Sequence, residues 1–222
     1  EGMCEAMHEF GGEIIGGDCS CGETKMISIT AIGEMSRPRI HRSNALPGDY
    51  IVSSGIHGLS RLGLALLTSE KLPSEAKLSD QIIQRAIKAH KRPYPAIKAL
   101  EALIQSKPDK TSWRVAGTDS SDGLLESIRG ICQSSNCQAV LSKDSVLKNP
   151  GWPQDSAWNE WILNGGEDYK LILCIPKEWA EALSIKLKSA QIIGFIKKGK
   201  PNIFWDNLEE INFRQSSLFK HF

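Results

Sequence analysis

The stretch "WRVAGTDSSDGLLESIRGICQSS", residues 113–135, contains the unit that decides the fold. Its first seven residues predict a short strand that ends at a polar turn. After that turn, Leu124, Leu125, Ile128 and Ile131 recur at the spacing that gives a helix one apolar face. A strand that leads through a glycine turn into an amphipathic helix predicts a helix packed on a sheet.

Strands and helices alternate in the same way on both sides of this unit. Further strands are predicted at residues 13–18, 25–34, 49–55, 137–142, 169–176, 191–196 and 201–206. Further helices are predicted from apolar spacing at residues 1–12, 58–69, 82–87, 97–104, 156–165 and 177–189. A polar segment at residues 35–49, with two prolines and the turn sequence "LPGD", predicts a linker. The alternation predicts an α/β or α+β protein with a domain boundary near residues 36–47.

Composition excludes two classes of partner. The 27 basic and 26 acidic side chains leave a net charge of +1, without the basic excess that nucleic-acid-binding proteins carry. No apolar run approaches the roughly 20 residues that span a bilayer, so we expect no membrane partner. The six cysteines are too scattered in 222 residues to predict a disulfide framework, which favours a reducing, cytoplasmic setting.

Three short motifs place carboxylates next to glycines where predicted strands end. They are "GGD" at residues 16–18, "DSSDG" at residues 119–123 and "GGED" at residues 165–168. Glycine lets backbone approach a ligand closely, and Mg²⁺ prefers carboxylate, phosphate and water oxygens. The helix after "DSSDG" begins with amide groups that suit a phosphate. A plain N-cap and turn explains "SDG" equally well, and neither GxxxxGK[ST] nor GxGxxG occurs in the chain.

Five ordered segments carry a resemblance to a known family. They are "IIGGD", "ITAIGE", "HRSNALPGDYIVSSGIHGLSRLGLALL", "GTDSSDGLLESI" and "NGGEDYKLIL", and the chain closes with "SLFKHF". In order and approximate spacing they resemble the thiamine-monophosphate kinase family, which shares a superfamily with aminoimidazole ribonucleotide synthetase and selenophosphate synthetase. The resemblance implies a two-domain aminoimidazole ribonucleotide synthetase-like architecture with a truncated N-terminal domain. Residues 1–36 would be the remnant of an ATP- and metal-binding domain, and residues 37–222 a C-terminal α/β domain.

The resemblance also implies an activity and a set of site residues. The activity is Mg²⁺-dependent phosphoryl transfer from ATP to thiamine monophosphate, giving thiamine diphosphate. Matching motifs assign ATP contacts to Gly17, Asp18, Arg42 and Ser121. They assign Mg²⁺ ligands to Asp18, Asp119 and Asp122, and contacts with thiamine phosphate to Glu167 and Phe219. The attacking phosphate oxygen is already ionised, so no catalytic base is expected, and all five histidines are interpreted as surface or structural residues.

The sequence also departs from the family. Cys19 stands where threonine is usual, and Ser120 where isoleucine or a similar residue is common. The chain enters the N-terminal domain midway, which predicts a truncated form of a protein that is a homodimer at full length. Two alternatives therefore stay open: a superfamily member with another substrate, and an inactive or partner-dependent fragment. A metal–thiolate site at Cys19 and Cys21 is disfavoured because no second cysteine or histidine pair stands at zinc spacing.

Overall fold

The computed structural model describes residues 2–35, 38–153 and 155–211. The chain divides into two compact units, Glu1–Arg37 and Pro38–Phe222, and each is described by itself. None of the described helices is both long and apolar enough to cross a lipid bilayer.

Unit 1 contains one helix, α1 (Gly2–Phe10), where the spacing of apolar residues predicts it. The strands predicted at residues 13–18 and 25–34 are wrong, because no described residue of unit 1 forms a strand there. A strand exists only where its N–H and C=O groups find a ladder partner. The β-branched side chains of these segments remain in solvent, and Ile15 and Ile27 are 87% and 85% exposed.

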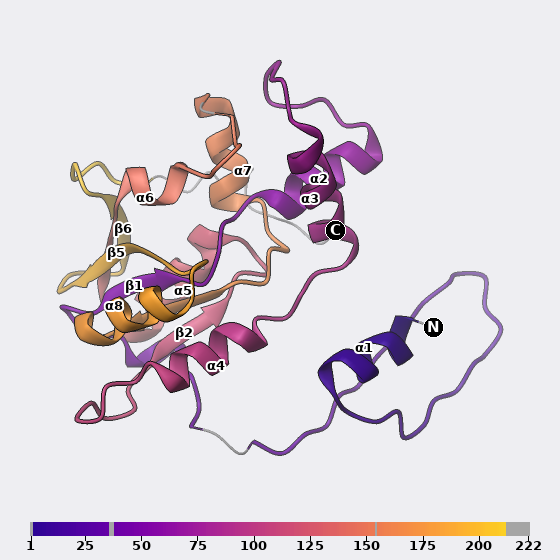
Figure 1. Cartoon of the computed structure of the whole chain (residues 1–222), viewed down its shortest axis with the longest axis horizontal. Coiled ribbons are helices and arrows are strands. Elements are labelled where there is room, and N and C mark those ends of the chain that lie inside the picture. Colours follow the sequence, from indigo (N-terminus) through magenta and orange to yellow (C-terminus); the bar gives the residue numbers. More distant parts are fainter. Residues whose placement is uncertain (1, 36–37, 154, 212–222) are drawn as a thin grey trace. The chain divides into compact units, whose positions relative to one another are not determined.

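Unit 2 is built on one six-stranded sheet (Figure 1). Its strand order is β2-β4-β1-β5-β3-β6, and neighbouring strands are antiparallel except for the parallel pair β3 and β6. The strands are β1 (Tyr50–Ser53), β2 (Ala116–Asp119), β3 (Gln138–Leu141), β4 (Leu171–Ile175), β5 (Gln191–Lys197) and β6 (Asn202–Trp205). All six lie where the sequence predicts strands in this part of the chain.

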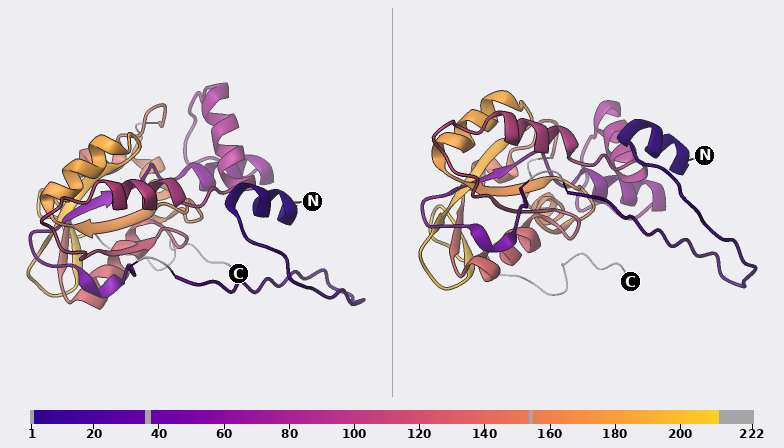
Figure 2. Two further views of the ribbon diagram at one scale, coloured as in Figure 1. Left: turned by 60° about the horizontal axis from the view of Figure 1, so that its bottom comes forward. Right: turned by 90° about the horizontal axis from the view of Figure 1, so that it is seen from below.

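Helices cover both faces of the sheet (Figure 2). Because successive strand residues point to opposite faces, Ile51 joins one apolar core and Val52 the other. The first core is shared with α2 (Leu59–Thr68), α3 (Asp80–Lys91), α5 (Leu124–Ser135), α6 (Lys143–Leu147) and α7 (Asn159–Asn164). The second is shared with α4 (Ile97–Gln105) and α8 (Lys177–Lys186). This arrangement confirms the predicted α/β class; only the five-residue α6 was not anticipated, because one turn is too short to show a period.

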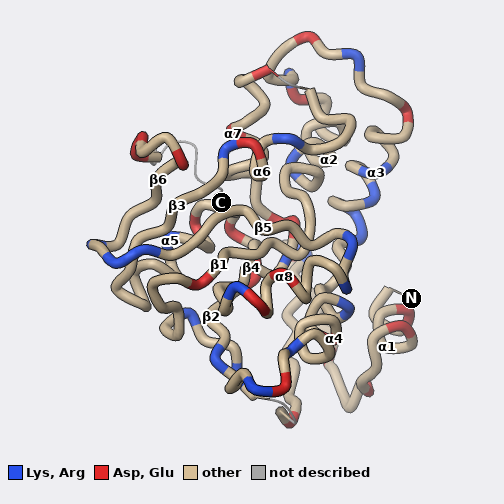
Figure 3. The backbone as a smooth tube through the Cα atoms, turned by 60° about the vertical axis from the view of Figure 1, so that its left-hand side comes forward, with Lys and Arg blue, Asp and Glu red and all other residues tan. Residues whose placement is uncertain are grey.

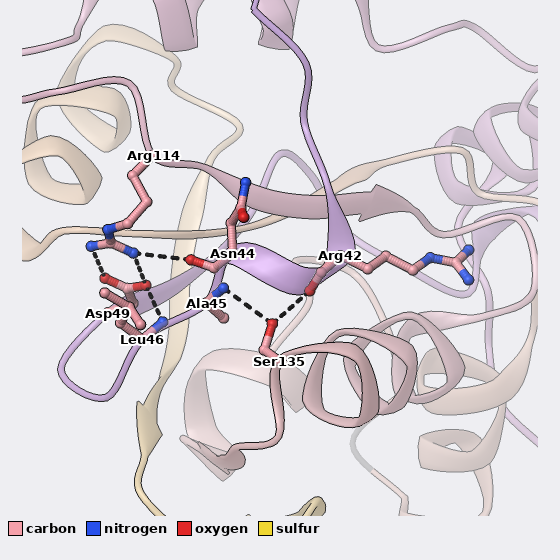
Figure 4. A network of polar contacts seen from close by, with 7 residues as sticks. All are labelled: Arg42, Asn44, Ala45, Leu46, Asp49, Arg114 and Ser135. Atoms are coloured by element: carbon pink, nitrogen blue, oxygen red, sulfur yellow. Dashed lines mark hydrogen bonds and ion pairs between the residues drawn. The ribbon is translucent and has the colours of Figure 1, made fainter.

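The predicted linker at residues 35–49 is wrong in its second half, because residues 41–49 are packed into unit 2 (Figure 4). His41 forms a bridge with Ala116, and Ala45 is buried. The Ala45 N–H donates to Ser135 Oγ at 3.1 Å, and Ser135 Oγ donates to the Arg42 carbonyl at 2.6 Å. These contacts join segments about 90 residues apart, so local polarity could not reveal them.

The turn at "LPGD" ends in a partly buried ion pair between Asp49 and Arg114. Gly48 has φ 96°, and the Asp49 N–H donates to the Leu46 carbonyl at 3.0 Å, which closes the turn. The Asp49 carboxylate accepts from Arg114 Nη1 and Nη2 at 2.6 and 2.7 Å. This two-point contact fixes residues 41–49 to the strand that precedes the "DSSDG" turn, and with them it fixes Arg42.

Candidate functional site

The "DSSDG" motif forms the connection between β2 and α5. Asp119 is the last residue of β2, and both Asp119 and Asp122 are exposed. Gly123 has φ 102°, and a Cβ there would lie 3.3 Å from Asn164 Cα, so only glycine fits without strain. The turn therefore holds two carboxylates in solvent, immediately before the first amides of a twelve-residue helix.

The "GGED" loop lies directly against this turn. The Glu167 N–H donates to the Ser121 carbonyl at 2.7 Å, and the Lys170 N–H donates to Ser120 Oγ at 3.0 Å. The register explains this, because β2 and β4 are antiparallel and Asp119 pairs with Leu171. The end of one strand therefore meets the start of the other, and two motifs nearly 50 residues apart become neighbours.

The "GGED" loop holds Glu167 and Tyr169 in an unusual backbone conformation. Glu167 and Tyr169 both have positive φ, at 55° and 50°, which is uncommon for residues with a Cβ and occurs often at functional sites. Burial raises the pKa of Tyr169, and the negative charges of Glu167, Asp119 and Asp122 raise it further. Three of the predicted site carboxylates thus act on one phenol group.

Arg42 lies at the same strand end. Its Nε and Nη2 atoms donate to Thr118 Oγ1 at 3.2 and 3.1 Å. Thr118 Oγ1 in turn donates to Asp119 Oδ1 at 3.4 Å, and the arginine stem passes Gly130 on α5. Figure 4 shows the guanidinium pointing away from the Asp49–Arg114 pair. The structure therefore brings a cation next to the predicted carboxylates.

Asp168, inside the same loop, has a structural task that sequence reasoning missed. Its carboxylate is buried and accepts from the N–H groups of Gly58 and Ser60 at 2.6 and 3.1 Å. It therefore satisfies amides at the start of α2, as a capping carboxylate does. Burial raises the pKa of Asp168 to about 6, although these two hydrogen bonds favour the charged form. The loop thus places the buried Asp168 between two partly exposed residues, Glu167 and Tyr169.

Three predicted site residues belong to other parts of the chain. Gly17 and Asp18 belong to unit 1, where both are exposed and Asp18 Oδ1 accepts from the Cys19 N–H at 2.8 Å. Phe219 lies outside the described residues. Among the residues that the structure describes, no three His, Cys, Asp or Glu side chains are close enough together to hold a metal ion by themselves.

Tyr169 also lines a small pocket. It has a volume of about 170 Å³ and is lined in part by Tyr94, Lys98, Tyr169 and Lys170. Small-molecule sites usually measure about 300–1,000 Å³. This pocket could therefore enclose only part of a nucleotide-sized ligand.

His57 contacts the "DSSDG" turn through Ser120. It is buried, and its Nε2 lies 3.1 Å from Ser120 Oγ, the oxygen that accepts from the Lys170 N–H. The serine hydroxyl can therefore donate its proton to the imidazole. Burial, together with the positive charge of Lys170, lowers the pKa of His57 to about 3. His57 is a neutral core residue, in agreement with its interpretation as surface or structural.

The buried imidazole makes stability depend on pH. The folded pKa of His57, about 3, lies below its unfolded value of 6.5, so the unfolded chain binds the extra proton between these values. The contribution of neutral His57 to the unfolding free energy is complete above pH 6.5 and is lost as the pH falls toward 3. Between pH 7 and pH 5 we expect the unfolding free energy of the unmodified chain to fall by about 2 kcal/mol relative to His57→Gln.

Urea unfolding at both pH values measures this difference. Both proteins retain Asp168, whose raised pKa acts in the opposite direction by stabilising the fold as the pH falls through about 6. His8→Gln, on exposed α1, is the matched control and should leave the difference unchanged. An equal pH dependence in the unmodified chain and His57→Gln would show that the buried imidazole takes up no proton on unfolding.

Comparison with known proteins places this fold in a family. Residues 47–206 match the family described as "AIR synthase related protein, C-terminal domain". The chain is 44% identical over 221 residues to the thiamine-monophosphate kinase of Prochlorococcus marinus, a match that covers 100% of this chain and 66% of the relative. It is 31% identical over 196 residues to the thiamine-monophosphate kinase of Escherichia coli, covering 84% of this chain and 55% of that protein.

Solved structures give the same result. One described as "AaThiL complexed with AMPPCP and TMP" has a TM-score of 0.61 and 27% identity, covering 82% of this chain and 54% of that chain. The thiamine monophosphate kinase of Aquifex aeolicus has a TM-score of 0.58 and 27% identity, covering 78% of this chain and 54% of that chain. The chain thus spans between about half and two thirds of the length of these relatives. Because the matched region takes in the whole sheet and both acidic motifs of unit 2, the chain belongs to the family of AIR synthase related proteins.

Proposed function

We propose that this chain takes part in the ATP- and Mg²⁺-dependent phosphorylation of thiamine monophosphate to thiamine diphosphate. One observation carries the proposal: the turn that holds Asp119 and Asp122 is hydrogen-bonded to the backbone of Glu167, in a chain that is 44% identical to a thiamine-monophosphate kinase. A similar structure is described as a complex with AMPPCP, an ATP analogue, and TMP, which we take as thiamine monophosphate. Both substrates of the proposed reaction therefore have a counterpart in that relative.

Asp119 and Asp122 fit a Mg²⁺ ion that is completed by substrate. Their carboxylates are exposed at one turn, and Mg²⁺ is usually held by one or two carboxylates together with phosphate and water oxygens. Such an ion would neutralise the charge that develops during phosphoryl transfer. The absence of a three-ligand cluster among the described residues is compatible with this kind of binding. In unit 1, Gly17 and Asp18 stay predicted as ATP and metal contacts.

The other residues have proposed roles in holding the two substrates. Arg42 supplies a guanidinium for the triphosphate, and Ser121 is the proposed second ATP contact. Glu167 supplies a carboxylate for the cationic heteroaromatic acceptor, and Phe219 stays a predicted contact with it. A phosphate oxygen of thiamine monophosphate forms a bond to the γ-phosphorus while the bond to the β–γ bridging oxygen breaks, and ADP leaves. Since the attacking oxygen is already ionised, no side chain needs to remove a proton.

The direct test is incubation of the chain with ATP, Mg²⁺ and thiamine monophosphate. We expect thiamine diphosphate and ADP to form in equal amounts, and chelation of Mg²⁺ to stop both. ADP release with another phosphorylated acceptor but not with thiamine monophosphate would favour a different superfamily substrate. Absence of any product would favour an inactive or partner-dependent fragment.

The proposal also includes a homodimer in the full-length protein and a cytoplasmic location. The location is supported by six cysteines that are all free, three of them buried at Cys132, Cys137 and Cys174. Free buried thiols are typical of reducing compartments. Light scattering of the full-length protein and fractionation of cells would test these two points.

A further inference from the structure

Three polar groups from separate elements meet beside the "GGED" loop. His90 Nδ1, on α3, lies 3.1 Å from Ser60 Oγ on α2 and 3.5 Å from Glu167 Oε2. Ser60 is buried, and the side chains of His90 and Glu167 are partly buried, at 21% and 30% exposed. The carboxylate that is proposed to contact the acceptor therefore has a partly enclosed imidazole beside it.

Close packing of α2 and α3 brings the histidine to this position. A Cβ at Gly63 would lie 2.1 Å from the Ala86 carbonyl oxygen and 2.8 Å from His90 Cβ. The two helices can approach this closely only because position 63 has no side chain. Figure 3 shows lysines and arginines along α3, so Glu167 lies beside a helix that carries several positive charges.

Both neighbours of the imidazole are themselves fixed. The Ser60 N–H donates to Asp168 Oδ1, which holds the start of α2 against the loop. Glu167 has φ 55°, and its N–H is bound to the Ser121 carbonyl. The backbone of Glu167 is thus set by the turn, while the direction of its carboxylate is left to side-chain contacts.

We propose that His90 is a positioning residue for Glu167. Its Nδ1 is in polar contact with both Ser60 Oγ and Glu167 Oε2, and the contact with Glu167 holds the carboxylate in the direction needed for the cationic acceptor. The inference deepens the proposed function and rests on it, since it concerns the binding of thiamine monophosphate. It gives a task to a histidine that the sequence led us to interpret as surface or structural.

Two substitutions separate this task from packing. His90→Leu keeps apolar bulk on α3 but removes the N–H, whereas His90→Asn keeps an N–H donor near the position of Nδ1. For His90→Leu we expect the KM for thiamine monophosphate to rise about tenfold, the effect of losing one polar contact with a charged group. We expect kcat and the KM for ATP to change less than about twofold, because the contact orients the acceptor in ground state and transition state alike. The KM of His90→Asn for thiamine monophosphate should stay within about threefold of the value for the unmodified chain.

An independent readout needs no substrate. ¹⁵N NMR of the imidazole in the unliganded chain should show a shift of His90 Nδ1 when Glu167 is replaced in Glu167→Gln. The matched control Glu181→Gln, on α8, should leave that resonance unchanged. An unmoved resonance, or equal KM values for His90→Leu and the unmodified chain at equal melting temperature, would overturn the inference. Failure of the unmodified chain to form thiamine diphosphate would overturn the proposed function and this inference with it.

Discussion

Asp122→Asn is expected to lower the rate of Mg²⁺-dependent thiamine diphosphate formation by at least about 100-fold. The amide has nearly the shape of the carboxylate but carries no charge, so it binds Mg²⁺ only weakly. Loss of one preorganised electrostatic contact typically costs about 10²–10³ in kcat. The side chain is exposed at the β2–α5 turn, so the substitution should affect the chemistry more than the fold.

The measurement is kcat at saturating ATP and thiamine monophosphate, over a range of Mg²⁺ concentrations. Asp144→Asn is the matched control, because Asp144 is an exposed acid on α6 that forms an ion pair with Lys148 at 2.7 Å. It should keep activity within about twofold, because it lies outside the predicted site and surface substitutions usually change stability by no more than about 0.5 kcal/mol. If Asp122→Asn kept the activity of this control at every Mg²⁺ concentration, Asp122 would not be a metal ligand.

Trp158→Ala is expected to lower the free energy of unfolding by about 3–5 kcal/mol. Trp158 is fully buried and packs edge-on against Trp152 and Trp161, with ring centroids 5.6 and 5.3 Å away. Its Nε1–H also donates to Ser74 Oγ at 2.9 Å. Truncation would leave a large cavity among the two remaining rings and remove one hydrogen bond.

The loss should reach the site as well as the core. The Trp152 ring lies 3.1 Å from where a Cβ at Gly58 would be, and the Gly58 N–H donates to Asp168. The tryptophan cluster therefore supports the start of α2 against the "GGED" loop. The tryptophan cluster of the core thus lies next to the loop that carries the acidic residues.

Urea or thermal unfolding measures the effect of Trp158→Ala. A domain of this size should lose about 2–4 °C in melting temperature for each kcal/mol. Trp113→Ala is a matched control, because Trp113 is only half-buried and should cost less. A loss at Trp158 no larger than the loss at Trp113 would mean that the cluster contributes little to the fold.

Sequence patterns predicted the sheet well because its strands are short apolar runs with turns between them. "YKLILCIP" predicted β4, and "QIIGFI" predicted β5. A strand whose two faces are both covered by helices is buried on both faces, so its sequence is a continuous apolar run that is easily recognised. The same propensity failed at residues 13–18 and 25–34, where β-branched residues have no strand partner among the described residues of unit 1. Propensity is local, whereas a ladder requires a second strand.

The candidate site was predictable in its residue types but not in its neighbours. The glycine–carboxylate motifs marked Asp119, Asp122 and Glu167, because backbone that must bend sharply next to acids leaves a local pattern. The contacts between distant residues left no such pattern: Asp168 at the start of α2, His57 next to Ser120, and His90 next to Ser60 each depend on residues 30 to 110 positions away.

The sequence by itself determined the α/β class, the order of strands and helices in unit 2 and the acidic turns, because periodicity, glycine and carboxylate patterns are properties of adjacent residues. Only the tertiary structure decided how residues 41–49 are attached to the rest of unit 2, because their partners Ser135 and Arg114 come from distant segments. It also decided that "DSSDG" and "GGED" are neighbours, because the antiparallel register of β2 and β4 joins the end of one strand to the start of the other. In the stretch at residues 113–135 the helix face was fixed locally, and the surroundings of its two aspartates were fixed by pairing across the sheet.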